Sequence, residues 1–184
     1  MLVLKIFQIF MHFLIFSGLQ EYIEALSFNF FLKTGQLIPL SDVQQRLTFM
    51  SSTSDSSEAD MSASDTQEIK VLVPPSEYVL GIADLTGEMM RRAIHSVGDG
   101  DLNRPFEICS ILQEMESAFT ALTNCNREVN RKLTVLRQSL RKVENACYTL
   151  KVRGSEIPQH MLVDVISKAG STSVFIDEAT VEDD

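Results

Sequence analysis

Cysteine, glycine and proline are all scarce in this chain of 184 residues, with 3, 8 and 5 of each. The cysteines (Cys109, Cys125 and Cys147) are odd in number and widely spaced without a Cys-x-x-Cys motif, which argues against a disulfide framework and a zinc site. A reducing compartment is the natural interpretation. The low glycine and proline content favours long helices over a turn-rich β fold.

Several motifs of enzyme chemistry are missing as well. The chain has no P-loop, no dinucleotide fingerprint and no His-Glu-x-x-His motif. None of its histidines (His12, His95 and His160) follows a glutamate at the Glu-x-x-His spacing of a di-iron bundle. We therefore expect the histidines to be structural or on the surface.

The net charge of −9 argues at first against a nucleic-acid binder, but the charge is unevenly distributed. Residues 51–68 hold five acidic groups and no basic one, and residues 177–184 hold another five. Without these ten, the 25 acidic groups fall to 15, against 16 basic ones. The remainder of the chain is close to neutral, so nucleic-acid binding stays open.

The first 18 residues are almost wholly apolar, interrupted by Lys5, Gln8 and His12. A bilayer needs about 20 apolar residues, so we expect no spanning helix and no stable membrane partner. Two interpretations remain. Lys5 and the small pair Ser17-Gly18 fit a secretory signal, whereas the odd cysteine count fits an atypical or buried N-terminal helix better.

Helical periodicity dominates the rest of the chain, which predicts an all-α bundle over residues 19–168. Apolar stripes predict helices over 19–33, from Pro75, from Pro105 to about 123, and over 127–152, with short helices at 41–50 and 158–168. Residues 51–70 are rich in serine and acid and predict a disordered loop. Residues 169–184 predict an acidic tail.

The first acidic pair, Glu21 and Glu24, lies on one face of its predicted helix, opposite the stripe of Leu19, Ile23, Leu26 and Phe30. Neither glutamate has a cation three or four residues away. Two like charges at this spacing need a positive partner. That partner is either a divalent cation or an arginine from elsewhere in the fold.

The second acidic pair, Asp84 and Glu88, is accompanied by Gly81 and Gly87 in the helix that begins at Pro75. Glycine within a helix costs about 1 kcal/mol relative to alanine, so these glycines predict room for a neighbour or a ligand. Alternatively, Glu88 pairs with Arg91 or Arg92 and the glycines only allow close helix packing. Together the two acidic pairs would form a carboxylate cluster, which Mg²⁺ prefers.

The helix over 127–152 and its end carry half of the chain's lysines and arginines, against Glu128 and Glu144 only. Such a sign bias is typical of surfaces that bind phosphate backbones. An ordinary solvated helix face is the alternative. The candidate nucleic-acid contacts are Arg127, Arg131, Arg137 and Arg141.

Three segments resemble the translin family: Leu19–Ala25, GIADLTGEMMR at 81–91 and KVENACYTLKVRGSEIPQHML at 142–162. The similarity runs from about Leu19 to Ser167 and is closest to the family members that associate with translin. It implies an all-α subunit of a hollow hetero-oligomer with translin. It also implies Mg²⁺-dependent endoribonuclease activity on single-stranded RNA, in passenger-strand removal and transfer-RNA processing, with single-stranded DNA a further ligand.

Carried over by position, the family's catalytic acids fall on Glu21, Glu24 and Asp84, with Glu88 as a further metal ligand. The resemblance implies a cytoplasmic and nuclear location. The family has further N-terminal helices where this chain has residues 1–18, so the sequence predicts a truncated or atypical start. A non-catalytic nucleic-acid-binding or scaffolding partner of translin is therefore the alternative function, and an inactive fragment a third.

Overall fold

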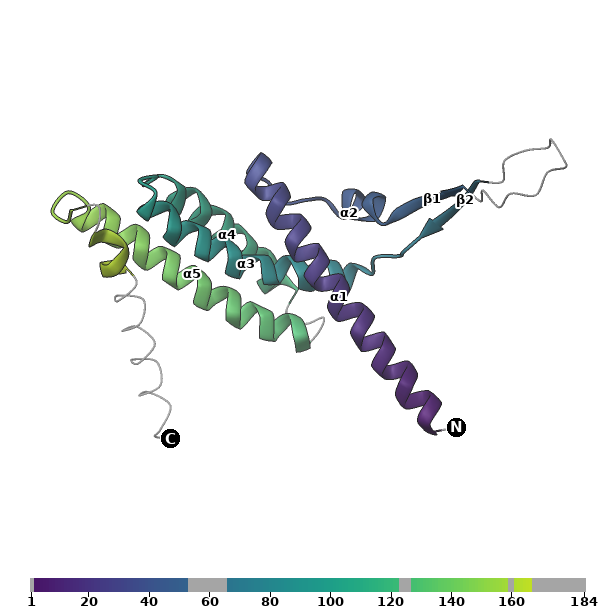
Figure 1. Ribbon diagram of the computed structural model, residues 1–184. Coiled ribbons are helices and arrows are strands. Elements are labelled where there is room, and N and C mark those ends of the chain that lie inside the picture. Colours follow the sequence, from purple (N-terminus) through teal and green to yellow (C-terminus); the bar gives the residue numbers. More distant parts are fainter. Residues whose placement is uncertain (1, 53–65, 123–126, 159–160, 167–184) are drawn as a thin grey trace, which may run out of the picture. The chain divides into compact units, whose positions relative to one another are not determined.

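The computed structural model describes residues 2–52, 66–122, 127–158 and 161–166. It is helical with one small two-stranded sheet, which confirms the all-α prediction (Figure 1). The chain divides into two compact units: the first unit is Met1–Ile82 and the second unit is Ala83–Asp184. Among the described residues, no helix combines the length and hydropathy needed to cross a bilayer.

The first unit contains α1 (Leu2–Thr34), α2 (Leu40–Arg46) and the start of α3 (Pro75–Gly98). Helix α1 ends where predicted: Gly35 has a φ of 71°, and its N–H donates to the carbonyl of Phe31 at 2.8 Å. Its buried face is Leu19, Ile23, Ser27 and Phe31, so the predicted stripe holds at Leu19 and Ile23 and then moves by one residue. The buried residues are four apart throughout and follow one ridge of the helix surface, whereas the predicted stripe alternated between spacings of four and three residues.

Helices α1 and α3 approach closely at Gly81. A Cβ atom at this position would lie 2.8 Å from the Cβ and Cγ2 of Ile23 and 3.0 Å from the backbone oxygen of Gln20. Beside this contact, Gln20 Nε2 donates to Glu77 Oε2 at 2.6 Å. Gly81 is therefore required for helix packing, the alternative left open by the sequence, while Gly87 meets only the Arg91 side chain at 3.8 Å.

The strands β1 (Thr48–Ser52) and β2 (Thr66–Lys70) pair antiparallel, from Thr48↔Lys70 to Ser52↔Thr66. Gln44 fixes their base, because its side chain donates to the carbonyl of Val71 at 2.9 Å and accepts from the N–H of Val73 at 3.0 Å. The prediction of a disordered loop over 51–70 is therefore wrong at both ends, and α2 stops at Arg46 instead of reaching residue 50. Residues 53–65 of that loop lie outside the described residues, as do residues 167–184 with the predicted tail.

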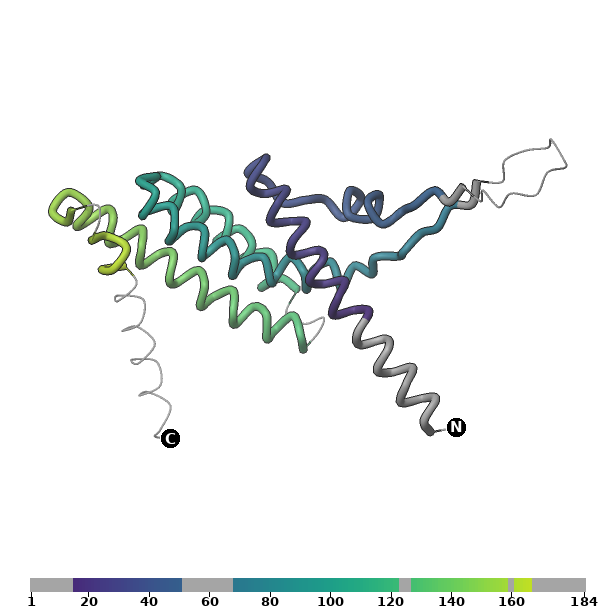
Figure 2. Tube along the Cα trace, viewed as in Figure 1, coloured from purple at the N-terminus to yellow at the C-terminus, as the bar shows by residue number. Residues whose placement is uncertain are grey.

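The second unit is built from the rest of α3, α4 (Arg104–Ala121) and α5 (Arg127–Arg153), which lie side by side (Figure 1). Helix α5 buries Val129, Leu133, Leu136, Leu140, Val143, Cys147 and Leu150, which confirms every position of its predicted stripe. Two contacts give the direction of α3: Asp84 meets Lys132, and Val97 meets Ala146 and Leu150. Helices α3 and α5 therefore run parallel, and α4, which connects them in the sequence, runs in the opposite direction (Figure 2).

Helices α4 and α5 are antiparallel neighbours joined by polar contacts at their edges. Gln113 Nε2 donates to Glu144 Oε1 at 2.9 Å, and Arg137 Nε lies 2.7 Å from Glu116 Oε1. Cys109 of α4 and Cys147 of α5 face each other in the same antiparallel register, and both are free thiols. Burial, together with the neighbouring Cys109, raises the pKa of Cys147 from 9.0 to about 12.

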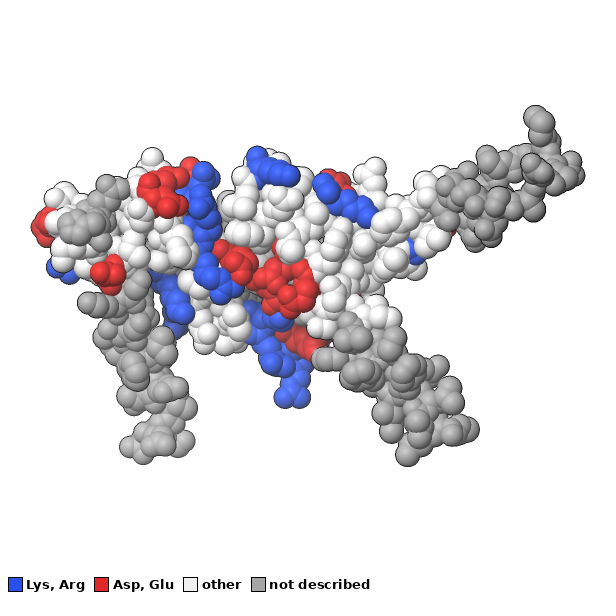
Figure 3. Space-filling model, in the orientation of Figure 1, with Lys and Arg blue, Asp and Glu red and all other residues white. Residues whose placement is uncertain are grey.

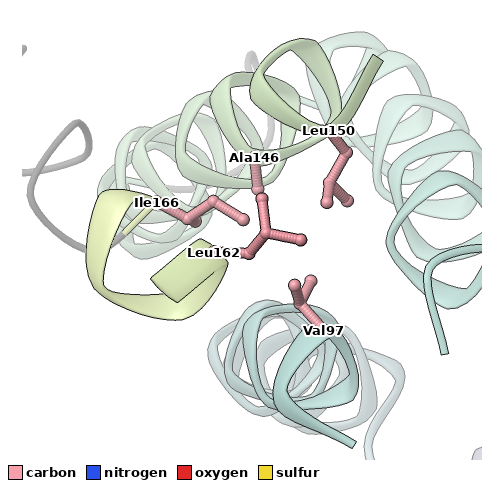
Figure 4. Close-up of a cluster of buried hydrophobic side chains, with 5 residues drawn as sticks. All are labelled: Val97, Ala146, Leu150, Leu162 and Ile166. Atoms are coloured by element: carbon pink, nitrogen blue, oxygen red, sulfur yellow. The ribbon is translucent and has the colours of Figure 1, made fainter. Parts of the chain in front are cut away.

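The far end of the second unit is closed by a separate apolar cluster. Val97, Ala146, Leu150, Leu162 and Ile166 pack together, and residues 161–166 form a short helix on α5 (Figure 4). Gly154 begins the turn that leads to it, since its N–H donates to the carbonyl of Leu150 at 3.0 Å. The predicted helix over 158–168 is thereby confirmed for residues 161–166, while residue 158 precedes it without helical structure.

We predict opposite effects for alanine at the two glycines of α3. Gly81→Ala should lower the free energy of unfolding by about 1–3 kcal/mol, because the added methyl overpacks against Ile23. Gly87→Ala should raise it by up to about 1 kcal/mol through helix propensity alone. Urea unfolding followed by circular dichroism measures both. Equal changes in the two variants would show that Gly81 is not a packing position.

We also predict a loss of stability at alkaline pH that depends on Cys147. When folding raises the pKa of a thiol, the thiol stabilises the folded state fully at any pH below its pKa in the unfolded state. This stabilisation is lost as the pH rises from about 9 towards 12. The free energy of unfolding of the unmodified chain should therefore fall more steeply over this range than that of Cys147→Ala. Parallel slopes would contradict the shift.

Candidate carboxylate site and basic helix

The first two candidate carboxylates lie on α1 in the first unit. Glu21 is exposed and Glu24 is half-buried, one helical turn apart, and they flank the fully buried Ile23. Ile23 is the residue that packs against Gly81, so its position holds this part of α1 firmly on the start of α3. Glu21 and Glu24 thereby lie on the section of α1 that packs against the start of α3.

The other two carboxylates lie on α3 in the second unit, and each has a basic partner. Asp84 is half-buried and forms an ion pair with Lys132 of α5. Glu88 forms an ion pair with Arg91, whose hydrogen bond lowers the pKa of Glu88 below its ordinary value. Of the two partners expected for Glu88, Arg91 is therefore the correct one, and Arg92 faces Asp99 at 3.5 Å instead.

These four side chains are chemically suited to a hard cation, since carboxylate oxygens are the ligands that Mg²⁺ prefers. The described residues hold no group of three or more acidic, histidine or cysteine side chains that could bind a metal ion. The predicted joint site of Glu21, Glu24, Asp84 and Glu88 thus stays a prediction. In its place the structure gives one contact that the sequence did not indicate, between Asp84 and Lys132.

The basic helix α5 keeps most of its cations at the surface. Arg127, Arg131 and Arg141 are exposed, and so is Arg137. Arg137 is partly neutralised by its ion pair with Glu116, and its Nη2 also donates to Thr120 Oγ1 at 3.2 Å. The hydrogen bond from Arg137 to Glu116 lowers the pKa of Glu116. On the visible face of the second unit, acidic and basic side chains accordingly lie next to one another (Figure 3).

Comparison with known proteins settles the family. The model of the Translin family matches residues 11–154 of the chain, which is more than half of its length. The chain belongs to the Translin family. This confirms the resemblance drawn from the three sequence segments, and the match includes all four candidate carboxylates and the four candidate arginines.

Individual Translin-family relatives agree with this assignment. Translin-associated protein X of Rattus norvegicus is 48% identical over 158 residues, which cover 82% of this chain and 54% of the relative. The Translin-associated protein X homolog of Schizosaccharomyces pombe is 28% identical over 149 residues, covering 76% and 52%. Translin of Gallus gallus is 32% identical over 78 residues, covering 42% and 34%. The chain spans about half the length of the Translin-associated protein X relatives.

The ion pair of Asp84 and Lys132 is shielded enough from water for its coupling energy to be measured. Both side chains are about two-thirds buried or more, with exposed fractions of 27% and 32%. Spacing could not predict the contact, because its partners lie 48 residues apart on α3 and α5. Sequence shows only that each residue is charged.

We predict a measurable coupling energy between Asp84 and Lys132. A double-mutant cycle with Asp84→Asn and Lys132→Met should give about 0.5–1 kcal/mol, since the pair is partly shielded from water. The matched control is Arg92 and Asp99 of the same unit, which are 3.5 Å apart and more exposed, and should couple by close to zero. Equal coupling in the two pairs would contradict the distinction.

Proposed function

We propose that this chain is the catalytic, translin-associated subunit of an Mg²⁺-dependent endoribonuclease that cleaves single-stranded RNA. The single observation that carries the proposal is family membership across residues 11–154, together with the presence of Glu21, Glu24 and Asp84 at the positions carried over from the family. The proposed partner is translin, and the proposed processes are passenger-strand removal and transfer-RNA processing. The cytoplasmic and nuclear location stays a prediction.

Two structural facts support the choice of residues. The contact between Gly81 and Ile23 makes α1 and α3 cross closely within the first unit. Glu21 and Glu24 flank Ile23 in α1 and so lie within about one turn of this crossing. In the second unit, Asp84 is held in place by its ion pair with Lys132.

In the proposed site, Glu21, Glu24 and Asp84 supply the negative charge that holds the cation, with Glu88 as a weaker ligand because Arg91 already neutralises it. A bound Mg²⁺ supplies charge stabilisation to the phosphoryl group and a more acidic water. Lys132 holds the Asp84 carboxylate in place when no cation is present. The exposed arginines of α5 bind the RNA backbone.

One observation favours a second candidate, a non-catalytic single-stranded nucleic-acid-binding partner of translin. Asp84 and Glu88 are both engaged by cations of the chain itself, while Arg127 and Arg131 of α5 are exposed. A protein with this charge distribution binds phosphate backbones without needing a metal. The two candidates differ in cleavage and agree in binding.

We predict that the chain, co-expressed with translin, cleaves single-stranded RNA with Mg²⁺ and stops with EDTA. Glu21→Gln, Glu24→Gln and Asp84→Asn should each lower the rate by at least about 100-fold, because each keeps the shape and removes charge needed at the transition state. Glu88→Gln should have a smaller effect, given its pairing with Arg91. Gel analysis of a 5′-labelled RNA measures the rates.

The matched control is Glu114→Gln, an exposed acid on α4, which should leave the rate unchanged. RNA affinity should survive all of these changes, which separates chemistry from folding. Full cleavage by the Glu21/Glu24/Asp84 triple variant would exclude the assignment. Binding without cleavage by the unmodified complex would select the second candidate.

A further inference from the structure

One aromatic side chain of the basic helix has no role in the core. Tyr148 of α5 is 68% exposed, more than Phe49, Phe106 or Tyr22, the other exposed aromatic residues in the described part of the chain. It is also the sole aromatic residue in the sequence of α5. Val135 and Val152 of α5 are exposed as well, but Tyr148 is more exposed than either and is the one that offers an aromatic face to solvent on this cation-rich helix.

Helix geometry explains why Tyr148 faces outward. At 100° per residue, Ala146 and Leu150 each lie about 160° around the helix from Tyr148. Both belong to the buried cluster with Val97, Leu162 and Ile166, and they point into it in Figure 4. The cluster fixes the rotation of α5 at this end, so the ring of Tyr148 is held on the outside.

The same geometry aligns Tyr148 with cations. Arg141 precedes it by seven residues and Arg137 by eleven, so both lie within about 20° of Tyr148 around the helix, and Lys151 lies about 60° away. Because Arg137 is paired with Glu116, we name Arg141, Tyr148 and Lys151 the basic face of α5. From Arg137 to Arg153 the helix carries five cations and a single acid. That acid, Glu144, lies one turn before Tyr148 and accepts a hydrogen bond from Gln113.

We propose that Tyr148 is a stacking platform for an unpaired base of single-stranded RNA or DNA, with the basic face of α5 holding the neighbouring phosphates. This inference rests on the proposed nucleic-acid function and adds a base contact to it. Aromatic rings beside cations are the combination by which proteins bind single strands without reading sequence. The positive charge around the ring selects a polyanion over an apolar protein surface.

The expected consequence is a loss of affinity that depends on bases. The full chain is titrated into a fluorescein-labelled oligouridylate and into an abasic oligomer of the same length. Tyr148→Leu should weaken binding of oligouridylate by about 5- to 150-fold, the range of base–aromatic stacking, and leave binding of the abasic strand unchanged. Tyr148→Phe should restore most of the affinity, because the ring remains.

Two controls separate stacking from charge and from folding. Val135→Ala shortens another exposed apolar side chain of α5, 53% exposed and about 140° around the helix from Tyr148, and should change neither affinity. Arg141→Ala should weaken binding of both strands and reduce the slope of log affinity against log salt, whereas Tyr148→Leu should leave that slope unchanged. Circular dichroism confirms that each variant is folded.

A spectroscopic signal tests the ring itself. The chain has three tyrosines and no tryptophan, so its intrinsic fluorescence reports tyrosine alone. Oligouridylate should quench part of this fluorescence, the abasic strand should not, and Tyr148→Phe should lose the quench while keeping the affinity. A merely structural tyrosine would not give this pattern.

Four outcomes would overturn the inference. Equal affinities of the unmodified chain and Tyr148→Leu for oligouridylate would exclude stacking while leaving the proposed function intact. Equal losses for both strands would show that Tyr148 acts on phosphates or on folding. Unchanged RNA binding with altered sedimentation of the chain or its translin complex would make this surface a protein interface. No binding by the unmodified chain would reject the nucleic-acid function and this inference together.

Discussion

The unbroken apolar face of α5 is the constraint on which the second unit depends. Ten of its residues from Val129 to Leu150 are buried, and α3 and α4 both pack against this helix. Because that face is fixed over the whole helix, every other side chain of α5 has its direction set as well. Lys132 is turned to Asp84, Arg137 to Glu116, and Tyr148 to solvent. The surface chemistry of the unit is thus a result of its core.

The sequence predicted the buried face of a helix well where the hydrophobic periodicity of that helix is regular. The seven positions of α5 are an uninterrupted heptad-like pattern, and all of them are buried. The stripe of α1 was predicted only in part, because Ser27 is buried where Leu26 was expected, and a buried serine leaves no mark in a hydrophobic pattern. The strands were not predicted, because they are held by a residue outside the segment 51–70. The side chain of Gln44 forms hydrogen bonds with the backbone of Val71 and Val73.

The candidate site divides in the same way. Spacing within α1 and within α3 was enough to single out Glu21, Glu24, Asp84 and Glu88, because residues three or four apart on a helix share a face. Spacing within a helix could not show which cation meets Asp84, because Lys132 belongs to another helix. Part of the positive charge on α5 serves the fold in the same way, because the basic stripe in the sequence includes Lys132 and Arg137, which pair with acids of α3 and α4.

The ladder between β1 and β2 has a consequence for how this fold varies between related proteins. Its last pair, Ser52↔Thr66, holds the two ends of the intervening segment side by side. The entropy of closing a loop grows only slowly with its length, by about 0.6 kcal/mol for each doubling. Residues inserted or deleted between these positions therefore change the free energy of folding little, and they leave the helices untouched. The ladder makes this the place where the chain can diverge in length and composition while α1 and α3 keep their crossing.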